Sequence, residues 1–128
     1  MKLFQRNKPQ PQKPTRTEAL AGIPQKSPSV TWQVLENGDI LLEYPLNIKP
    51  FFVQLANRLG KTAEQRLTKK LQLDAMGSRV WQMFDGVNDV KTIIIEVAQQ
   101  SGLSLLETEI AVTAFLRQLG RRGLVLIR

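Results

Sequence analysis

Apolar and polar residues alternate with a period of two on both sides of the turn sequence Glu36-Asn37-Gly38. This alternation predicts two strands that are joined as a hairpin. The apolar members of the two strands are Val30, Trp32, Val34, Ile40, Leu42 and Tyr44. A three-residue loop that ends in Gly38 places all of them on one face, whereas a two-residue loop divides them between two faces. We therefore predict the three-residue loop, with Gly38 in the left-handed conformation and Val34 opposite Ile40.

A short helix and a third strand are predicted after the hairpin. Pro45 closes the second strand, which favours an edge position for that strand. Apolar residues then recur at helical spacing between Pro50 and Gly60, which is typical of a short helix. Over residues 67–73 leucines alternate with polar residues, and this predicts a third strand. Lys69 is a charged residue on the face of this strand that otherwise carries the leucines.

Three amphipathic helices are expected in the C-terminal half of the chain. The first is predicted over residues 75–84, and the second runs from the N-cap Asp89 to Gly102. The third begins at Ser104, which has capping-box spacing, and ends near Gly123. Short links between the helices favour a helix-turn-helix bundle, so the predicted fold class is α+β. The last residues, 124–127, are expected to add a short strand or to cover the core.

Residues 1–28 differ in composition from the rest of the chain. They hold five of the seven prolines and few apolar residues, and we expect a flexible basic arm there and a folded domain over residues 29–128. The formal charge of +7 is unevenly divided: residues 1–29 carry six Lys and Arg against one Glu, a net +5, and the rest carries twelve against ten, a net +2. The folded domain is therefore nearly balanced in charge, and a nucleic-acid partner is not favoured.

The chain contains no Cys and no His. Their absence excludes thiolate zinc sites, protein-ligated iron–sulfur clusters and imidazole as a catalytic base. A carboxylate or lysine mechanism stays open in principle, but solvated charges and helix caps are the usual roles of carboxylates. We therefore expect no catalytic residue, no metal site and no cofactor, and we predict that the chain is not an enzyme. No run of about 18 apolar residues is present, so no membrane span is expected. The first sixteen residues lack the apolar stretch of a secretory signal, and a cytoplasmic location is the default expectation.

The segment from Leu73-Asp74 to Asp85-Gly86 joins a strand ending in Leu-Asp to a turn of small residues, a helix carrying Trp81, and Asp-Gly. Together with Ile93-Ile94, the run 115–119 and Arg122-Gly123-Leu124, this segment resembles the PqqD family over roughly residues 30–127. The resemblance implies a winged-helix-like three-helix bundle with an N-terminal hairpin and a third strand. It also implies recognition of ribosomally made precursor peptides.

In PqqD, which serves PQQ biosynthesis, the domain presents a precursor peptide to a radical enzyme that uses S-adenosylmethionine. The leader part docks as an added strand against the third strand, alongside the third helix. A free strand edge offers unpaired backbone groups to such a guest. The resemblance therefore implies a partner peptide and a modifying enzyme for this chain.

The predicted peptide-binding residues lie on the third strand and the third helix. The third strand is the only one that we expect to have a free edge. Its predicted peptide-binding residues are Leu67, Thr68, Lys69, Lys70, Leu71, Gln72 and Leu73. On the helix they are Thr108, Ala111, Val112, Phe115 and Leu119. A basic rim of Lys69, Lys70, Arg117 and Arg121 would favour an acidic or amphipathic leader. Val112, Phe115 and Leu119 also have ordinary core spacing, and the two lysines could instead protect the edge against aggregation.

Two other functions stay open from the sequence. DNA binding by the helix-turn-helix is disfavoured because Glu107 and Glu109 open the third helix, where they would repel phosphates. Only about five residues follow that helix, too few for a wing hairpin. The other alternative is a structural or assembly adaptor, including a homodimer formed through the same strand edge.

Overall fold

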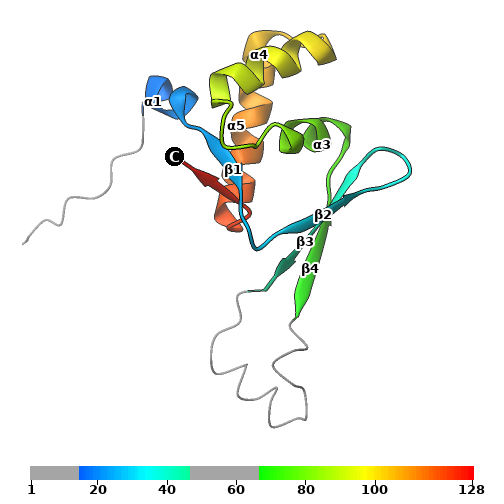
Figure 1. Cartoon of the computed structure of the whole chain (residues 1–128). Helices are drawn as coiled ribbons and strands as arrows, with labels where there is room; N and C mark the ends of the chain where they lie inside the picture. The colour runs from blue at the N-terminus through cyan, green and yellow to red at the C-terminus, as the bar shows by residue number, and fades with distance from the viewer. Residues whose placement is uncertain (1–14, 47–66) are drawn as a thin grey trace, which may run out of the picture.

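The computed structural model describes residues 15–46 and 67–128, and Figure 1 shows the arrangement of their helices and strands. In chain order these are α1 (Arg16–Ala21), β1 (Pro24–Lys26), β2 (Thr31–Val34), β3 (Ile40–Pro45), β4 (Thr68–Gln72), α3 (Ala75–Gln82), α4 (Val90–Ser101), α5 (Leu105–Arg121) and β5 (Val125–Ile127). The antiparallel strands β2, β3 and β4 form one sheet in that order, and β1 pairs with β5 in another. The predicted α+β class is confirmed. The helix predicted between Pro50 and Gly60 lies outside the described residues.

The β2–β3 hairpin has the predicted register and loop. Val34 lies opposite Ile40, and Trp32 lies opposite Leu42. The N–H of Gly38 donates to the carbonyl of Leu35 at 3.0 Å, and Gly38 has a φ of 90°. A residue without Cβ adopts this left-handed conformation at low cost, and the three-residue loop follows from it.

Strand β3 is the central strand of its sheet, so the predicted edge position after Pro45 is wrong. The N–H of Leu46 points toward β4, where it donates to the carbonyl of Leu67 at 3.0 Å. Successive backbone groups alternate in direction, so the nitrogen of Pro45 faces the β2 side. Strand β2 starts at Thr31, which pairs with Glu43, and Pro45 lies beyond that pair. The missing N–H therefore costs the sheet no hydrogen bond.

The helix boundaries follow from local capping, as the sequence predicts. Asp89 accepts a hydrogen bond from the N–H of Thr92 at 2.8 Å at the start of α4, and Gly102 ends α4 with a φ of 74°. At the start of α5, Ser104 and Glu107 make both hydrogen bonds of a capping box. These contacts satisfy helix-end groups that the core does not reach.

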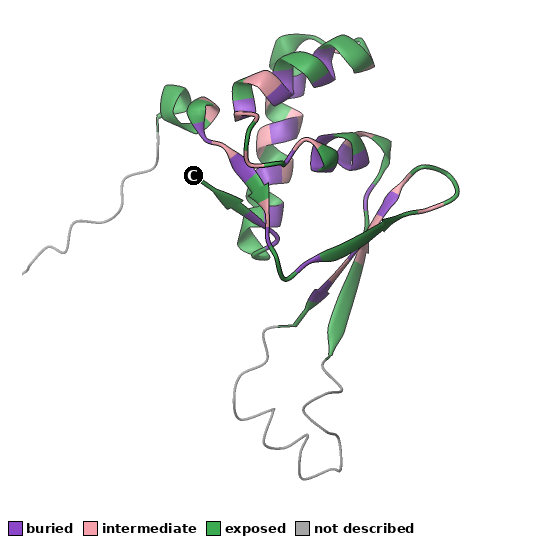
Figure 2. Ribbon diagram, in the orientation of Figure 1, coloured by how far each residue is buried: buried purple, intermediate pink, exposed green. Residues whose placement is uncertain are grey.

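The core lies between the inner face of β3 and the helices, as the burial pattern in Figure 2 shows. Ile40 and Leu42 on β3 and Trp81 on α3 are fully buried. One buried hydroxyl connects the sheet to α3, because the N–H of Ile40 donates to Oγ of Ser78 at 2.8 Å. This bond fixes the start of α3 against the strands.

Residues 15–28 are ordered, which corrects the expected arm that extends to residue 28. Thr15 and Glu18 form a capping box at the start of α1, and Arg16 forms a salt bridge with Glu109 of α5 at 2.7 Å. Strand β1 pairs with β5, so the short C-terminal strand that was one of two expectations is confirmed. Residues 1–14 lie outside the described part of the chain.

Lys26, at the end of β1, explains why this segment packs on the domain. Its Nζ donates to the carbonyl of Phe84 at 3.1 Å and lies 5.6 and 5.5 Å from the ring centroids of Trp32 and Trp81. Partial burial lowers the pKa of Lys26, and the nearby carboxylate of Asp85 opposes that effect. A lysine that the sequence places in a charged arm therefore contacts the folded core.

Candidate functional site

Two backbone hydrogen bonds show which way β4 faces. The N–H of Leu46 donates to the carbonyl of Leu67, and the N–H of Leu73 donates to the carbonyl of Ile40 at 2.8 Å. The direction of the backbone N–H and C=O groups alternates along a strand. In β4 these groups therefore bond to β3 at odd-numbered residues and point away from β3 at even-numbered residues. The outward-pointing residues are Thr68, Lys70 and Gln72. Within residues 15–46 and 67–128, no strand pairs with this outer edge.

The side chains of β4 divide between the two faces of the sheet. Lys69 lies opposite Tyr44, and Leu71 lies opposite the buried Leu42, so these two side chains share the face that is turned toward the helices. Thr68 and Lys70 are on the other face, where Oγ1 of Thr68 donates to Glu43 at 2.9 Å. The two lysines that were predicted to rim one groove therefore lie on opposite faces.

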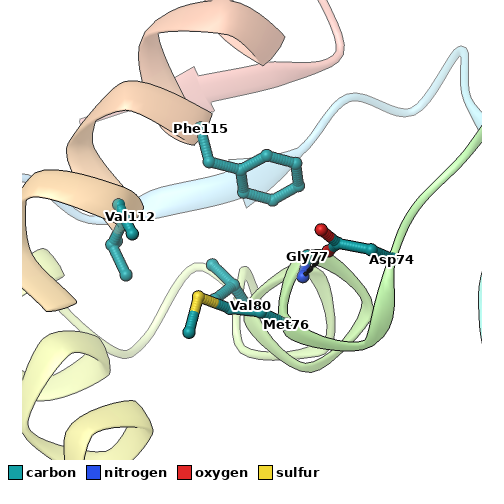
Figure 3. Close-up of a pocket in the computed structure, with 7 residues that line it drawn as sticks. Asp74, Met76, Gly77, Val80, Val112 and Phe115 are labelled. Atoms are coloured by element: carbon teal, nitrogen blue, oxygen red, sulfur yellow. Dashed lines mark hydrogen bonds between the residues drawn. The ribbon is translucent and has the colours of Figure 1, made fainter. Parts of the chain in front are cut away.

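An apolar pocket lies where β4 leads into α3. It is lined by Asp74, Met76, Gly77, Val80, Ala111, Val112 and Phe115, and it encloses about 160 Å³. In Figure 3, the ring of Phe115 on α5 lies over the first turn of α3, where the carboxylate of Asp74 accepts a hydrogen bond from the N–H of Gly77 at 2.7 Å. A dry cavity of comparable size holds a benzene ring, so the pocket has room for one apolar side chain.

Gly77 lies between the cap residue Asp74 and the ring of Phe115 at this pocket. A Cβ at this position would lie 3.1 Å from the carboxylate of Asp74 and 3.4 Å from the ring of Phe115. Phe115 also stacks on the core residue Phe84, with the ring centroids 6.2 Å apart. The pocket wall is therefore held in place by packing on both of its sides.

The predicted α5 residues are found in two different environments. Ala111, Val112 and Phe115 line the pocket. Thr108 and Leu119 are fully buried in the core and offer no surface to a ligand in this conformation. Of the predicted strand residues, Leu73 is buried, whereas the remaining six, over residues 67–72, are exposed or half-buried.

The predicted cations of α5 do not border the pocket. Arg117 and Arg121 are exposed, and at 100° per residue Arg117 lies on the side of α5 opposite its buried face. Arg122 was not predicted for the site, yet its Nη1 donates to the hydroxyl of Tyr44 at 3.2 Å. The available signal was spacing, because Arg122 follows Phe115 by seven residues and therefore shares its helix face.

The lining residues from α3 were also missed by the sequence prediction of the site. Asp74, Met76, Gly77 and Val80 follow the third strand directly in the sequence, and that proximity was the available signal. The pocket itself requires α3 and α5 to pack together, which no local pattern shows.

Strand β2 has a second free edge in the described part of the chain, which corrects the expectation that only the third strand has one. Its apolar side chains Trp32 and Val34 are 43% and 56% exposed. A second pocket there, of about 230 Å³, is lined by β2 and β3 residues and is mostly polar, unlike the pocket beside β4. The β4 edge is thus distinguished by the apolar pocket next to it.

Carboxylates with lowered pKa values are found at caps and turns. Hydrogen bonds from Thr92 lower the pKa of Asp89, and hydrogen bonds from Asn88 and Val87 lower the pKa of Asp85. Within the described ranges, Asp and Glu side chains form no group of three or more that could hold a metal ion. None of the helices described is long and apolar enough to span a membrane.

Comparison with known proteins identifies the part of the chain that carries the site. The family model of coenzyme PQQ synthesis protein D (PqqD) matches residues 65–125, which include β4, α3, α4 and α5 but not the hairpin. A solved structure of TbiB1 in complex with the TbiA(beta) leader peptide has the same fold, with a TM-score of 0.56 and 18% identity. The alignment covers 79% of this chain and 93% of the TbiB1 chain. No curated protein shows significant sequence similarity. Residues 65–125, which hold the open strand edge and its pocket, are thus the part of this chain that is similar to the PqqD family.

Proposed function

We propose that this domain binds the leader part of a ribosomally made precursor peptide, which adds as a strand to the outer edge of β4. The observation that carries the proposal is the row of outward backbone groups at Thr68, Lys70 and Gln72, which pair with no strand among the described residues. An extended peptide completes such an edge with main-chain hydrogen bonds, and these do not depend on its sequence.

The pocket between α3 and α5 supplies the selectivity in this proposal. It begins at Asp74, two residues beyond the last residue of β4, so a peptide on the edge extends toward it. One apolar side chain of the peptide would enter the space beside Phe115 and Gly77. Burial of such a side chain contributes about 1.5–3 kcal/mol, which is enough to select among peptides that all pair equally well with the edge.

The domain acts as a carrier in this proposal and not as a catalyst. It presents the bound precursor to a separate modifying enzyme, such as a radical enzyme that uses S-adenosylmethionine, on a winged-helix-like scaffold. The match of residues 65–125 to the PqqD family model and the leader peptide in the similar TbiB1 structure support this role. Because the ligand is a ribosomally made peptide, the proposal places the encounter in the cytoplasm.

Amide hydrogen exchange of the full chain, with and without a candidate leader peptide, tests the proposed mode. The N–H groups of Thr68, Lys70 and Gln72 point outward, so they should exchange quickly in the free protein and slowly in the complex. The N–H groups of Lys69 and Leu71 already face β3 and should change little. Protection that appears only along β2, or equally at all β4 residues, would contradict strand addition at this edge.

A further inference from the structure

We propose that Lys69, Arg122 and the hydroxyl of Tyr44 form a carboxylate-binding site at the end of the β4 edge remote from the pocket. This inference rests on the proposed peptide-binding function, because the ligand it assigns is an Asp or Glu side chain of the bound peptide. It adds a position-specific acidic requirement to that function.

The three residues lie at one end of the sheet. Tyr44 lies on β3 directly opposite Lys69 on β4, and Cβ atoms of such pairs are about 4.5–5.5 Å apart. Arg122, at the C-terminal end of α5, donates from Nη1 to the hydroxyl of Tyr44 at 3.2 Å. Arg122 therefore contacts the hydroxyl of Tyr44, and Lys69 is the cross-strand neighbour of the same tyrosine.

This cluster has donors to spare, and the described residues give it no matching acceptor. The guanidinium of Arg122 has five N–H donors, and the hydrogen bond to Tyr44 uses one of them. The hydroxyl of Tyr44 accepts that bond and keeps its own proton to donate. Within residues 15–46 and 67–128, the salt bridge found joins Arg16 to Glu109, and no carboxylate bridges Lys69 or Arg122. Two positively charged residues beside a hydroxyl donor suit a carboxylate.

Strand geometry assigns the position of the acidic residue. In a peptide antiparallel to β4, the residue opposite Leu73 places its side chain on the helix-facing side, next to the pocket. The residue opposite Lys69 follows four positions later and has the same orientation. The site therefore selects peptides in which an apolar residue is followed at i+4 by Asp or Glu. A carboxylate at i+3 lies on the other face of the sheet and does not reach the cluster.

Protection of the edge against aggregation is the simpler explanation of Lys69. That role accounts for a lysine on β4, but it does not account for Arg122, which is on a helix and is directed at the sheet by Tyr44. An edge guard also has no preference for one position in a peptide. Position dependence therefore separates the two explanations.

Selection from a randomised peptide library, displayed on mRNA and captured by the full chain, tests the site with ligands of every sequence. We expect the enriched peptides to carry an apolar residue followed at i+4 by Asp or Glu. The double variant Lys69→Glu with Arg122→Glu should enrich Lys or Arg at that position instead. Arg117→Glu makes the same change of charge as Arg122→Glu on the opposite face of α5, and it should leave the acidic preference intact.

Affinity measurements on one selected peptide complete the test. Replacement of its i+4 Glu by Gln should raise the Kd about fivefold for the unaltered protein and leave it unchanged for the double variant. Tyr44→Phe, which removes only the hydroxyl, should weaken binding of the Glu peptide but not of the Gln peptide. Enrichment of apolar peptides without an acidic preference at i+4 would overturn the carboxylate site and leave the proposed function standing. Failure to enrich any peptide that protects the β4 amides would overturn both.

Discussion

The substitution Lys70→Pro tests the outer edge of β4 without disturbing the hydrogen bonds between β4 and β3. The N–H of Lys70 points away from β3, because the flanking bonds at Leu67 and Leu73 assign the odd-numbered residues to β3. Lys70→Pro should therefore leave the β3–β4 pairing intact, as edge strands tolerate proline where the N–H faces outward. We expect the free energy of unfolding to fall by no more than about 1 kcal/mol. A bound peptide loses one main-chain hydrogen bond and meets the proline ring, which costs about 1–2 kcal/mol, or about a five- to thirtyfold higher Kd.

The matched control is a proline one residue earlier. The N–H of Lys69 faces Tyr44 on β3, so Lys69→Pro should break the sheet and lower the free energy of unfolding by about 2–4 kcal/mol. Urea unfolding gives the stabilities, and calorimetric titration with a leader peptide gives the affinities. The reasoning would be refuted if Lys70→Pro unfolded the domain while Lys69→Pro did not, since the register of β4 would then be wrong. It would also be refuted by a folded Lys70→Pro variant that binds the peptide normally.

Further predictions concern the pocket, the buried hydroxyl and a helix cap. Ala111→Phe fills the pocket and should raise the Kd about tenfold for peptides with an apolar anchor, with little change for the same peptide with alanine in its place, as measured by fluorescence anisotropy. Ser78→Ala removes the acceptor of the Ile40 N–H and should lower the free energy of unfolding by about 1–3 kcal/mol in urea titrations; an unchanged midpoint would contradict this role. Hydrogen bonds from Thr92 lower the folded-state pKa of Asp89, so its stabilising effect is present above about pH 4 and is lost as the pH falls through that lowered value. Unfolding measured from pH 6 to pH 2 should show a smaller acid loss in Asp89→Asn, and equal losses would argue against this cap as a source of acid sensitivity.

The sequence predicts correctly those features for which a local pattern of residues is compatible with only one local structure. The hairpin register follows from parity, because a slip of one residue would turn Trp32 and Val34 to the other face. The ends of α4 and the start of α5 follow from capping residues at Asp89, Gly102 and Ser104, which act within a few positions.

The features that the sequence does not predict depend on contacts between distant segments. Strand β1 has three residues, too few for a period, and exists because β5 pairs with it about a hundred residues later. Similarly, Gly77 and Phe115 meet in the pocket although nearly forty residues separate them. Arg122 shares a helix face with Phe115, but its contact with Tyr44 requires the sheet to be in place.

The open edges on β2 and β4 have a consequence for the behaviour of many copies of this chain in solution. Contact of the β4 edge of one molecule with the β2 edge of the next joins two different surfaces, so each copy that adds leaves one edge free for another. Repetition of the contact builds a ring if the rotation between copies closes and an open filament if it does not. A peptide bound to β4 blocks this contact, so we expect the peptide-bound protein to assemble less than the free protein at the same concentration.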